Sequence, residues 1–139
     1  MNPVETNITD VLLFSLREYY DDGSLVPITG KVDIPFSIKR VFLVTNVDQT
    51  LRGNHAHTKC NQVLIATNGI IDVHVFDGKD RKAITLDKVN KALFIPVGIW
   101  NTEQYFTKDS TLLVLCDYIY DPQEYIKDIE RFKEWKQKK

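Results

Sequence analysis

The chain has 139 residues, of which 43% are hydrophobic and 27% are charged, proportions that suit one globular domain with a sizeable core. The formal net charge of −1 excludes a global basic field for nucleic acid, and the apolar runs are too short to span a bilayer. Because residues 1–10 are polar and acidic and do not resemble a secretory signal, we expect one cytoplasmic domain over residues 1–139, with neither nucleic acid nor a membrane as a partner.

Strand patterns dominate most of the chain, in short apolar runs separated by polar turns. We expect extended segments over residues 11–16, 25–28, 39–45, 62–67, 70–76, 83–86, 92–95 and 111–116. Turns are expected at residues 21–24, 68–69 and 77–80. Because Asn68-Gly69 favours positive φ at both positions, it predicts a hairpin in which residues 70–76 return beside 62–67. This regular spacing, without intervening helices, predicts a β-sandwich or barrel.

The C-terminal segment differs from the rest. Asp121-Pro122-Gln123-Glu124 combines a capping residue, a proline and an acid, which predicts the start of a helix. Apolar side chains then recur at helical spacing and predict a stripe that packs on the barrel: Tyr125, Ile129, Phe132 and Trp135 or Lys136. Cys60 and Cys116 lie in apolar runs and are expected to be buried thiols.

The most informative motif is the pair His55 and His57. In an extended strand, residues i and i+2 share a face, so both imidazoles are expected to face one metal or substrate. With Gln62, Gly69 and Pro96 to Asn101, the motif resembles the two signatures of cupins. This resemblance implies an all-β, cupin-type jelly-roll barrel, here followed by a short C-terminal α-helix.

Gln62 and Asn101 stand where metal-binding cupins have a glutamate and a final histidine. Two histidines and two neutral amides form a poor site for a divalent ion, so we expect no metal and no other cofactor. Neutral imidazoles suit proton abstraction and return, and the two amides could support an enediolate. His74 is expected to be an ordinary sheet histidine.

Arginines near these strands suggest a diphosphate ligand. Arg40 and Arg52 offer planar groups that match phosphate oxygens, although ion pairs at the surface are the alternative. We also count Asn54 and Trp100 among the candidate substrate-binding residues, Trp100 because an aromatic ring could stack on a nucleotide base.

Longer segments make the resemblance specific. The chain is similar, from about residue 20 to 132, to the dTDP-4-keto-6-deoxyglucose 3,4-ketoisomerases in three early segments and one late one: residues 23–25, 34–41, 52–57 and 115–126. The resemblance implies a homodimer, often with exchanged N-terminal strands, and a dTDP-linked 4-keto-6-deoxy sugar in each barrel. It implies products for 3-amino-3,6-dideoxyhexoses of surface glycans such as the O-antigen of lipopolysaccharide. It also assigns His55 and His57 to the active site, and we favour His57 as the base.

Two departures keep alternatives open. Family members often have tyrosines where this chain has Phe42-Leu43, and can have a histidine where it has Asn101. Another donor would then be needed, with Tyr105, Tyr118 and Tyr120 as candidates. The alternatives are a 3,5-epimerase-like enzyme, a non-catalytic nucleotide-sugar-binding module and, more distantly, a metal-dependent dioxygenase. The choice between galacto and gluco products, and between dTDP and UDP, stays open.

Overall fold

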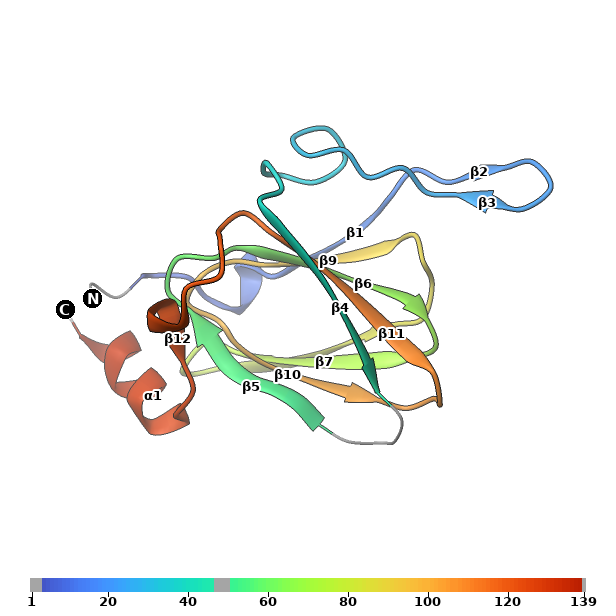
Figure 1. The fold of residues 1–139 in the computed structure, drawn as a ribbon. Helices are drawn as coiled ribbons and strands as arrows, with labels where there is room; N and C mark the ends of the chain where they lie inside the picture. The colour runs from blue at the N-terminus through green and yellow to red at the C-terminus, as the bar shows by residue number, and fades with distance from the viewer. Residues whose placement is uncertain (1–3, 47–50, 139) are drawn as a thin grey trace.

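Two five-stranded antiparallel sheets face each other in the computed structural model, which describes residues 4–46 and 51–138. The strand orders are β1-β9-β6-β11-β4 and β12-β5-β10-β7-β8 (Figure 1). The strands are β1 (Leu12–Ser15), β2 (Tyr19–Tyr20), β3 (Ser24–Leu25), β4 (Arg40–Asn46), β5 (Leu51–His57), β6 (Gln62–Asn68), β7 (Ile71–Phe76), β8 (Arg81–Leu86), β9 (Lys91–Ile95), β10 (Trp100–Tyr105), β11 (Ser110–Cys116) and β12 (Tyr125–Ile126). This arrangement confirms the all-β, cupin-type jelly roll.

The predicted hairpin at Asn68-Gly69 is wrong. β6 pairs with β9 and β11, whereas β7 pairs with β8 and β10, so these two residues connect the two sheets. Gly69 has a φ of +79°, as an Asn-Gly turn favours. The turn is held instead by the loop before β11, because the Asn68 side chain donates to the Asp109 carbonyl at 2.8 Å and the Ile70 N–H donates to Thr107 at 3.0 Å.

The predicted start of the C-terminal helix is also wrong. Asp121 caps only the 3₁₀ turn η2 (Pro122–Glu124), after which the chain extends as β12 and pairs with β5. The helix α1 (Ile129–Gln137) begins after Asp128, whose carboxylate accepts from the backbone of the first turn. Tyr125 therefore lies outside the helix. A second 3₁₀ turn, η1 (Ile8–Asp10), precedes β1.

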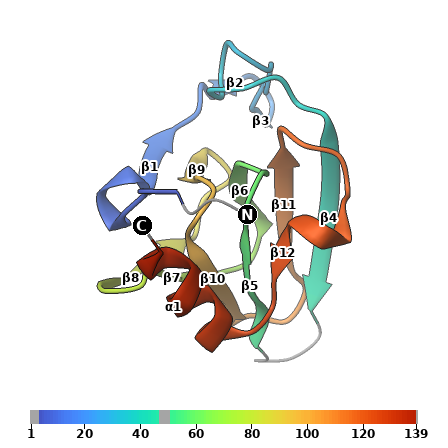
Figure 2. The ribbon, with the colours of Figure 1, turned by 90° about the vertical axis from the view of Figure 1, so that its left-hand side faces the viewer.

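Helix α1 covers one end of the barrel (Figure 2). Its buried residues Phe132 and Trp135 pack with Phe76 and Trp100 on the outer face of the second sheet. The predicted packing stripe is thus confirmed for Phe132 and Trp135, since burial of these large rings is the main stabilising contribution of an amphipathic helix.

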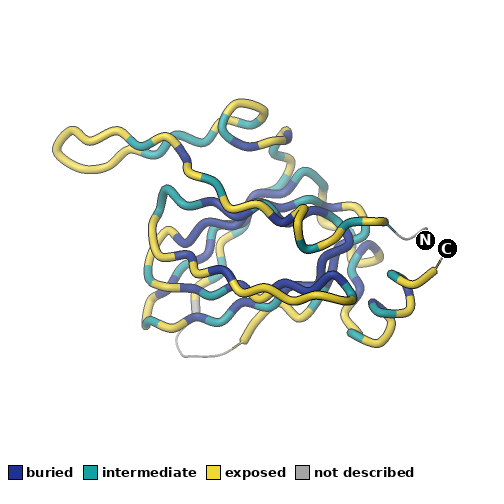
Figure 3. The backbone as a smooth tube through the Cα atoms, turned by 180° about the vertical axis from the view of Figure 1, so that it is seen from behind, coloured by how far each residue is buried: buried dark blue, intermediate teal, exposed yellow. Residues whose placement is uncertain are grey.

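The first sheet is apolar on both faces. One face lines the barrel core, with Leu64, Leu93 and Leu112 fully buried, and the other packs against the segment before β4 through Ile34 and Phe36. In contrast, β2 and β3 form an arm that projects beyond the barrel and is mostly exposed (Figures 1 and 3). Within residues 4–46 and 51–138, no helix has the length and apolar character needed to cross a membrane.

Candidate active site

A cavity of about 200 Å³ lies between the two sheets. Its walls come from the facing strands β4 and β5, with β6, β10 and β11 behind them, so the topology brings together residues far apart in sequence. Apolar side chains such as Phe42, Leu64 and Val114 line part of it. The charged and polar lining residues are Arg40, Arg52, His55, Gln62, Glu103, Tyr105 and Tyr125.

A bulge in β5 builds one wall of this cavity. Asn101 lies opposite His55 and Thr102 lies opposite Gly53, so Asn54 is an extra residue in the pairing of β5 with β10. Gly53 and Asn54 both have positive φ, +88° and +57°. Because the extra residue shifts the pleat, Arg52 and His55 face the same side although they are three residues apart.

The two histidines of the motif lie on the same face, as their spacing predicts. The centroids of the His55 and His57 rings are 4.9 Å apart, and the Tyr125 ring lies 5.3 Å from His55 and 4.4 Å from His57. Burial, and then the neighbouring His57, lower the pKa of His55 to about 4. His55 is therefore a neutral imidazole at physiological pH.

Glu124 fixes the orientation of His57. Its carboxylate oxygens lie 2.6 and 2.9 Å from His57 Nδ1, and it also accepts from the Cys60 N–H at 3.0 Å. Both side chains are almost fully buried. The carboxylate selects the tautomer with a proton on Nδ1, which leaves Nε2 as the basic nitrogen. Nε2 has no hydrogen-bond partner in the described part of the chain.

Arg40 is held by Tyr125 and by two aromatic rings. Its guanidinium donates to the Tyr125 hydroxyl at 3.0 Å and lies over the rings of Phe42 and Tyr120, 4.8 and 5.2 Å from their centroids. Arg52 is exposed at the cavity edge. Neither arginine forms an ion pair with any residue of 4–46 or 51–138. Guanidinium groups match the oxygens of an anionic ligand.

The two amides are buried on opposite sheets. Gln62 lines the cavity and its amide nitrogen donates to the Cys116 sulfur at 3.7 Å. Asn101 lies across from His55, and its amide nitrogen is unpaired among the residues described. Buried polar groups are usually hydrogen-bonded, so an unpaired amide nitrogen on the residue opposite His55 is a candidate for a ligand contact.

Glu103, on the next inward position of β10, is a site residue that the sequence did not indicate. It is buried, its Oε2 has no partner in the described chain, and burial raises its pKa to about 8 against the opposing charge of Arg52. Gly53 makes room for it, because a Cβ at residue 53 would lie 2.7 Å from Glu103 Oε2. The hydroxyl of Tyr105, one of the candidate donors, is also buried without a partner.

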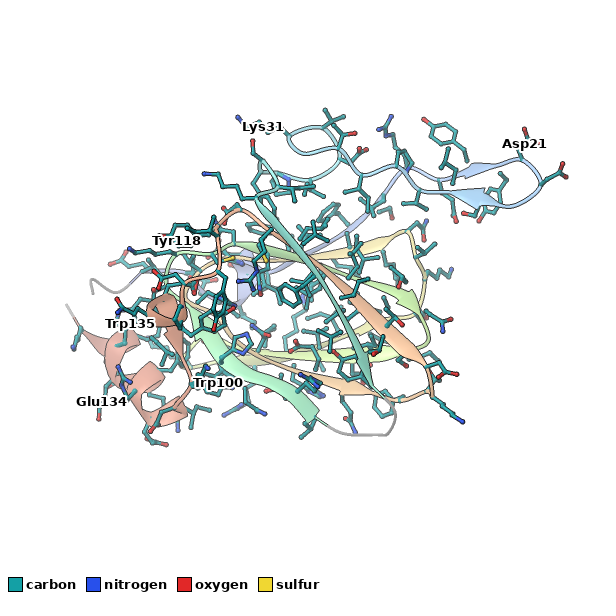
Figure 4. All side chains as sticks on the ribbon, in the orientation of Figure 1. Asp21, Lys31, Trp100, Tyr118, Glu134 and Trp135 are labelled. Atoms are coloured by element: carbon teal, nitrogen blue, oxygen red, sulfur yellow. The ribbon has the colours of Figure 1, made fainter. Side chains whose placement is uncertain are left out.

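Trp100 and Asn54 do not join this group. Trp100 lies on the opposite face of β10 from Asn101 and packs against Phe132 of α1, with ring centroids 5.8 Å apart (Figure 4). Asn54 is exposed at the bulge, where its side-chain oxygen accepts from Thr102. Strand alternation explains both placements, since each is adjacent to an inward-facing residue. His74 is also exposed, as expected for a sheet histidine.

Among residues 4–46 and 51–138, one group of side chains could supply metal ligands. Ligand atoms of His57, Cys60 and Glu124 lie within 4.8 Å of one another. However, His57 Nδ1 and the Glu124 carboxylate already bond to each other, and an ion would have to replace that bond. At the cupin ligand positions, Gln62 and Asn101 contribute only neutral amides, which fit a divalent ion poorly. We therefore derive no chemical step through a metal.

Comparisons with known proteins agree with this geometry. The family model described as "FdtA: WxcM-like, C-terminal" matches residues 9–137. A TDP-4-oxo-6-deoxy-α-D-glucose-3,4-oxoisomerase of Aneurinibacillus thermoaerophilus is 38% identical over 114 residues, covering 81% of this chain and 82% of that protein.

Solved structures give the same result. The sugar 3,4-ketoisomerase QdtA from Thermoanaerobacterium thermosaccharolyticum, in complex with TDP, has a TM-score of 0.88 and 36% identity over 92% of this chain and 95% of its own. A 3,4-ketoisomerase from Helicobacter canadensis has a TM-score of 0.90 and 32% identity over 93% and 98% of the two chains. This chain belongs to the FdtA-like family of sugar-nucleotide 3,4-ketoisomerases.

Proposed function

We propose that this protein moves the ketone of a dTDP-linked 4-keto-6-deoxyhexose from C4 to C3. The observation that carries the proposal is the buried Glu124–His57 pair, in which Nε2 is left as the basic nitrogen. The His57 ring lies 4.9 Å from that of His55, which lines a cavity together with Arg40 and Arg52. The names of the relatives, sugar-nucleotide 3,4-ketoisomerases, favour this reaction over epimerisation or binding without catalysis.

The chemistry begins at C3, where the neighbouring C4 ketone makes the proton acidic. His57 Nε2 takes this proton, and the electron pair of the C3–H bond moves toward the C4 carbonyl oxygen to give an enediolate. The imidazolium, stabilised by the Glu124 carboxylate, then returns a proton to C4. Movement of the hydroxyl proton from O3 to O4 leaves the ketone at C3 and a hydroxyl at C4.

Other residues bind and orient the sugar nucleotide. Arg40 and Arg52 would hold the diphosphate, since guanidinium groups match phosphate oxygens. The buried amides of Gln62 and Asn101 would donate to the oxygen on which negative charge develops. His55, neutral because of its burial, would contact the ring beside them.

The product would be consumed in the cytoplasm by an aminotransferase-type reaction at C3. That step would give a 3-amino-3,6-dideoxyhexose for surface glycans, such as the O-antigen of lipopolysaccharide. An aminotransferase-type reaction at C3 requires a ketone at that carbon, and the proposed product has one. This match supports the place of the enzyme directly before such a reaction.

We also propose that the protein is a homodimer. β4 is an edge strand whose outward side chains Val41 and Leu43 are 53% and 63% exposed, and the arm formed by β2 and β3 exposes Tyr20 and Leu25. Large exposed apolar side chains on an edge strand and on a projecting arm are typical of an interface. Light scattering should give twice the mass of the chain for the wild type and the monomer mass for Leu43→Asp; a monomeric wild type would contradict the proposal.

Proton NMR in D₂O with dTDP-4-keto-6-deoxyglucose tests the function, with and without EDTA. We expect the 3-keto isomer with deuterium at C4, unchanged by EDTA, and coupling constants that assign galacto or gluco. Deuterium at C5 without migration of the ketone would instead indicate an epimerase. Tight binding of the sugar nucleotide without exchange would indicate a binding module, and loss of activity with EDTA would indicate a metal.

A further inference from the structure

Glu103 is a buried acid that the histidine mechanism leaves without a role. Its side chain lines the same cavity as His55 and Arg52, and it occupies the position of β10 next to the Asn101–His55 pairing. Glu103 is only 7% exposed, and Oε2 has no hydrogen-bond partner within the described residues. Burying a carboxyl group without a partner is costly, which indicates that a ligand supplies the missing contact.

The local backbone is arranged around this carboxyl group. The β5 bulge turns Arg52 toward Glu103, and the pairing of β5 with β10 places the two residues opposite each other. Gly53 leaves the space that the carboxyl group occupies, since any Cβ there would lie within 2.7 Å of Oε2. The bulge thus gives this acid room while keeping it at the cavity wall.

The proposed ketone migration needs one proton transfer that a single base at C3 does not perform. The substrate has a hydroxyl at O3 and a ketone at C4, whereas the product has a ketone at C3 and a hydroxyl at O4. The C–H proton moves from C3 to C4, and a second proton must move from O3 to O4. A carboxylic acid can donate from one oxygen while accepting at the other, so it ends the transfer as neutral as it began.

We propose that Glu103, as a neutral carboxylic acid, carries this second proton. After the enediolate has formed, Oε2 or Oε1 donates to O4, and the other oxygen accepts the proton of the O3 hydroxyl as the C3 ketone forms. The inference rests on the ketoisomerase function proposed above. Family members often have tyrosines where this chain has Phe42 and Leu43, which cannot donate a proton. Glu103 would supply the missing donor.

Other groups in the cavity are less suited to this transfer. The Tyr125 hydroxyl oxygen already accepts from Arg40, and a phenol has only one oxygen for both donation and acceptance. Burial raises the pKa of Tyr105, so that phenol gives up its proton reluctantly. His55 has a pKa lowered to about 4, which makes a protonated intermediate unfavourable.

Burial keeps Glu103 protonated near neutral pH. Burial raises its pKa to about 8, and only Arg52 opposes this shift appreciably. The titratable groups that face the cavity beside it are Arg52 and His55 on β5, Tyr105 on β10, Arg40 on β4 and Tyr125 on β12. The residues of the neighbouring β7 that point inward are apolar, Ile71, Val73 and Val75.

Glu103→Gln tests the proposal because the amide keeps the shape of the side chain but does not relay a proton. In D₂O, NMR follows two processes separately: loss of the C3 proton from the substrate, and formation of the 3-keto product. We expect product formation to fall by roughly 100-fold or more, while loss of the C3 proton stays within roughly tenfold of wild type. Glu134→Gln, at an exposed position of α1, is the matched control and should change neither process (Figure 4).

Equal loss of both processes in Glu103→Gln, or loss of neither, would overturn the proposal. The wild-type pH profile is a second test that needs no variant: product formation should decline above about pH 8 while loss of the C3 proton does not. A parallel decline of both would also overturn it. A wild type that neither exchanges nor isomerises would remove the proposed function itself, and this inference with it.

Discussion

Two buried glutamates lie in the same barrel and differ in their hydrogen bonds. Glu124 is almost fully buried, and its carboxylate accepts from His57 and from the Cys60 backbone. Glu103 is buried to a similar degree, yet one of its oxygens has no partner among the residues described. A carboxylate with protein donors has an orienting role, whereas one without them is suited to act on a ligand.

The difference follows from the strands that position each residue. Glu124 is the last residue of η2 and directly precedes β12, which pairs with the end of β5 that carries His57. Glu103 lies in mid-strand on β10, opposite Arg52, where the bulge leaves space instead of a donor. We infer that Glu124 supports the transfer of the C–H proton through His57, and that Glu103 supports the transfer of the O–H proton.

Replacing His57, the side chain that Glu124 orients, should have the largest effect on the reaction rate. In His57→Asn, we expect product formation and loss of the C3 proton to fall together by roughly 10⁴-fold, because no other basic nitrogen is held at this position. The measurement is NMR in D₂O, with TDP affinity as the control for folding. Exchange at C3 that persists in this variant would assign the base to another residue.

Glu103 should make stability depend on pH, unlike a glutamine at the same position. Its pKa is raised from 4.5 to about 8, so the folded state holds the proton more tightly than the unfolded chain does. This contribution is complete below about pH 4.5 and is lost as the pH rises toward 8, on the order of 5 kcal/mol in total.

Urea unfolding of wild type and Glu103→Gln between pH 4.5 and 9 measures that contribution. The variant should gain stability relative to wild type as the pH increases, since glutamine does not ionise. A difference in unfolding free energy that stays constant over this range would contradict a neutral Glu103.

A moderate effect is expected for Glu124→Gln. The amide oxygen can still accept from His57 Nδ1, but the negative charge that stabilises the imidazolium is lost. We expect both proton transfers to slow by roughly 100-fold, with their ratio unchanged. Steady-state rates and C3 exchange check this, and a variant as active as wild type would show that the charge of Glu124 has no role.

The smallest effect is expected outside the barrel. Trp100 packs against α1 and does not line the cavity, so Trp100→Phe should cost roughly 1–2 kcal/mol of stability and leave kcat/KM within about twofold of wild type. Thermal unfolding and substrate titration measure the two quantities. A tenfold increase in KM would mean that Trp100 contacts the nucleotide after all.

Much of the fold was predictable from local patterns. Alternating apolar residues and regular turns indicate the strands, and the i, i+2 rule places His55 and His57 on one face. The same rule, applied to Asn101, would have placed Trp100 outside the barrel. β10 was not predicted, because its run of Asn, Thr, Glu and Gln has the composition of a loop.

The remainder of the site depends on contacts between distant residues. Glu124 and His57 are separated by 67 residues in the sequence. The capping motif that begins at Asp121 predicts that Glu124 belongs to the first turn of a helix, and this hides its role in the site. The face on which Arg52 lies depends on the bulge at Gly53, and simple alternation gives the opposite answer. The hairpin error at Gly69 has the same origin, since the choice of sheet is made by the loop before β11.

One measurement compares the two glutamates directly: the ratio of C3 proton loss to product formation in Glu124→Gln and Glu103→Gln, by NMR in D₂O. We predict the wild-type ratio in Glu124→Gln, because both transfers slow together, and a ratio raised at least tenfold in Glu103→Gln, because only the O–H transfer is blocked. The same ratio in both variants would contradict the assignment of separate proton transfers to the two acids.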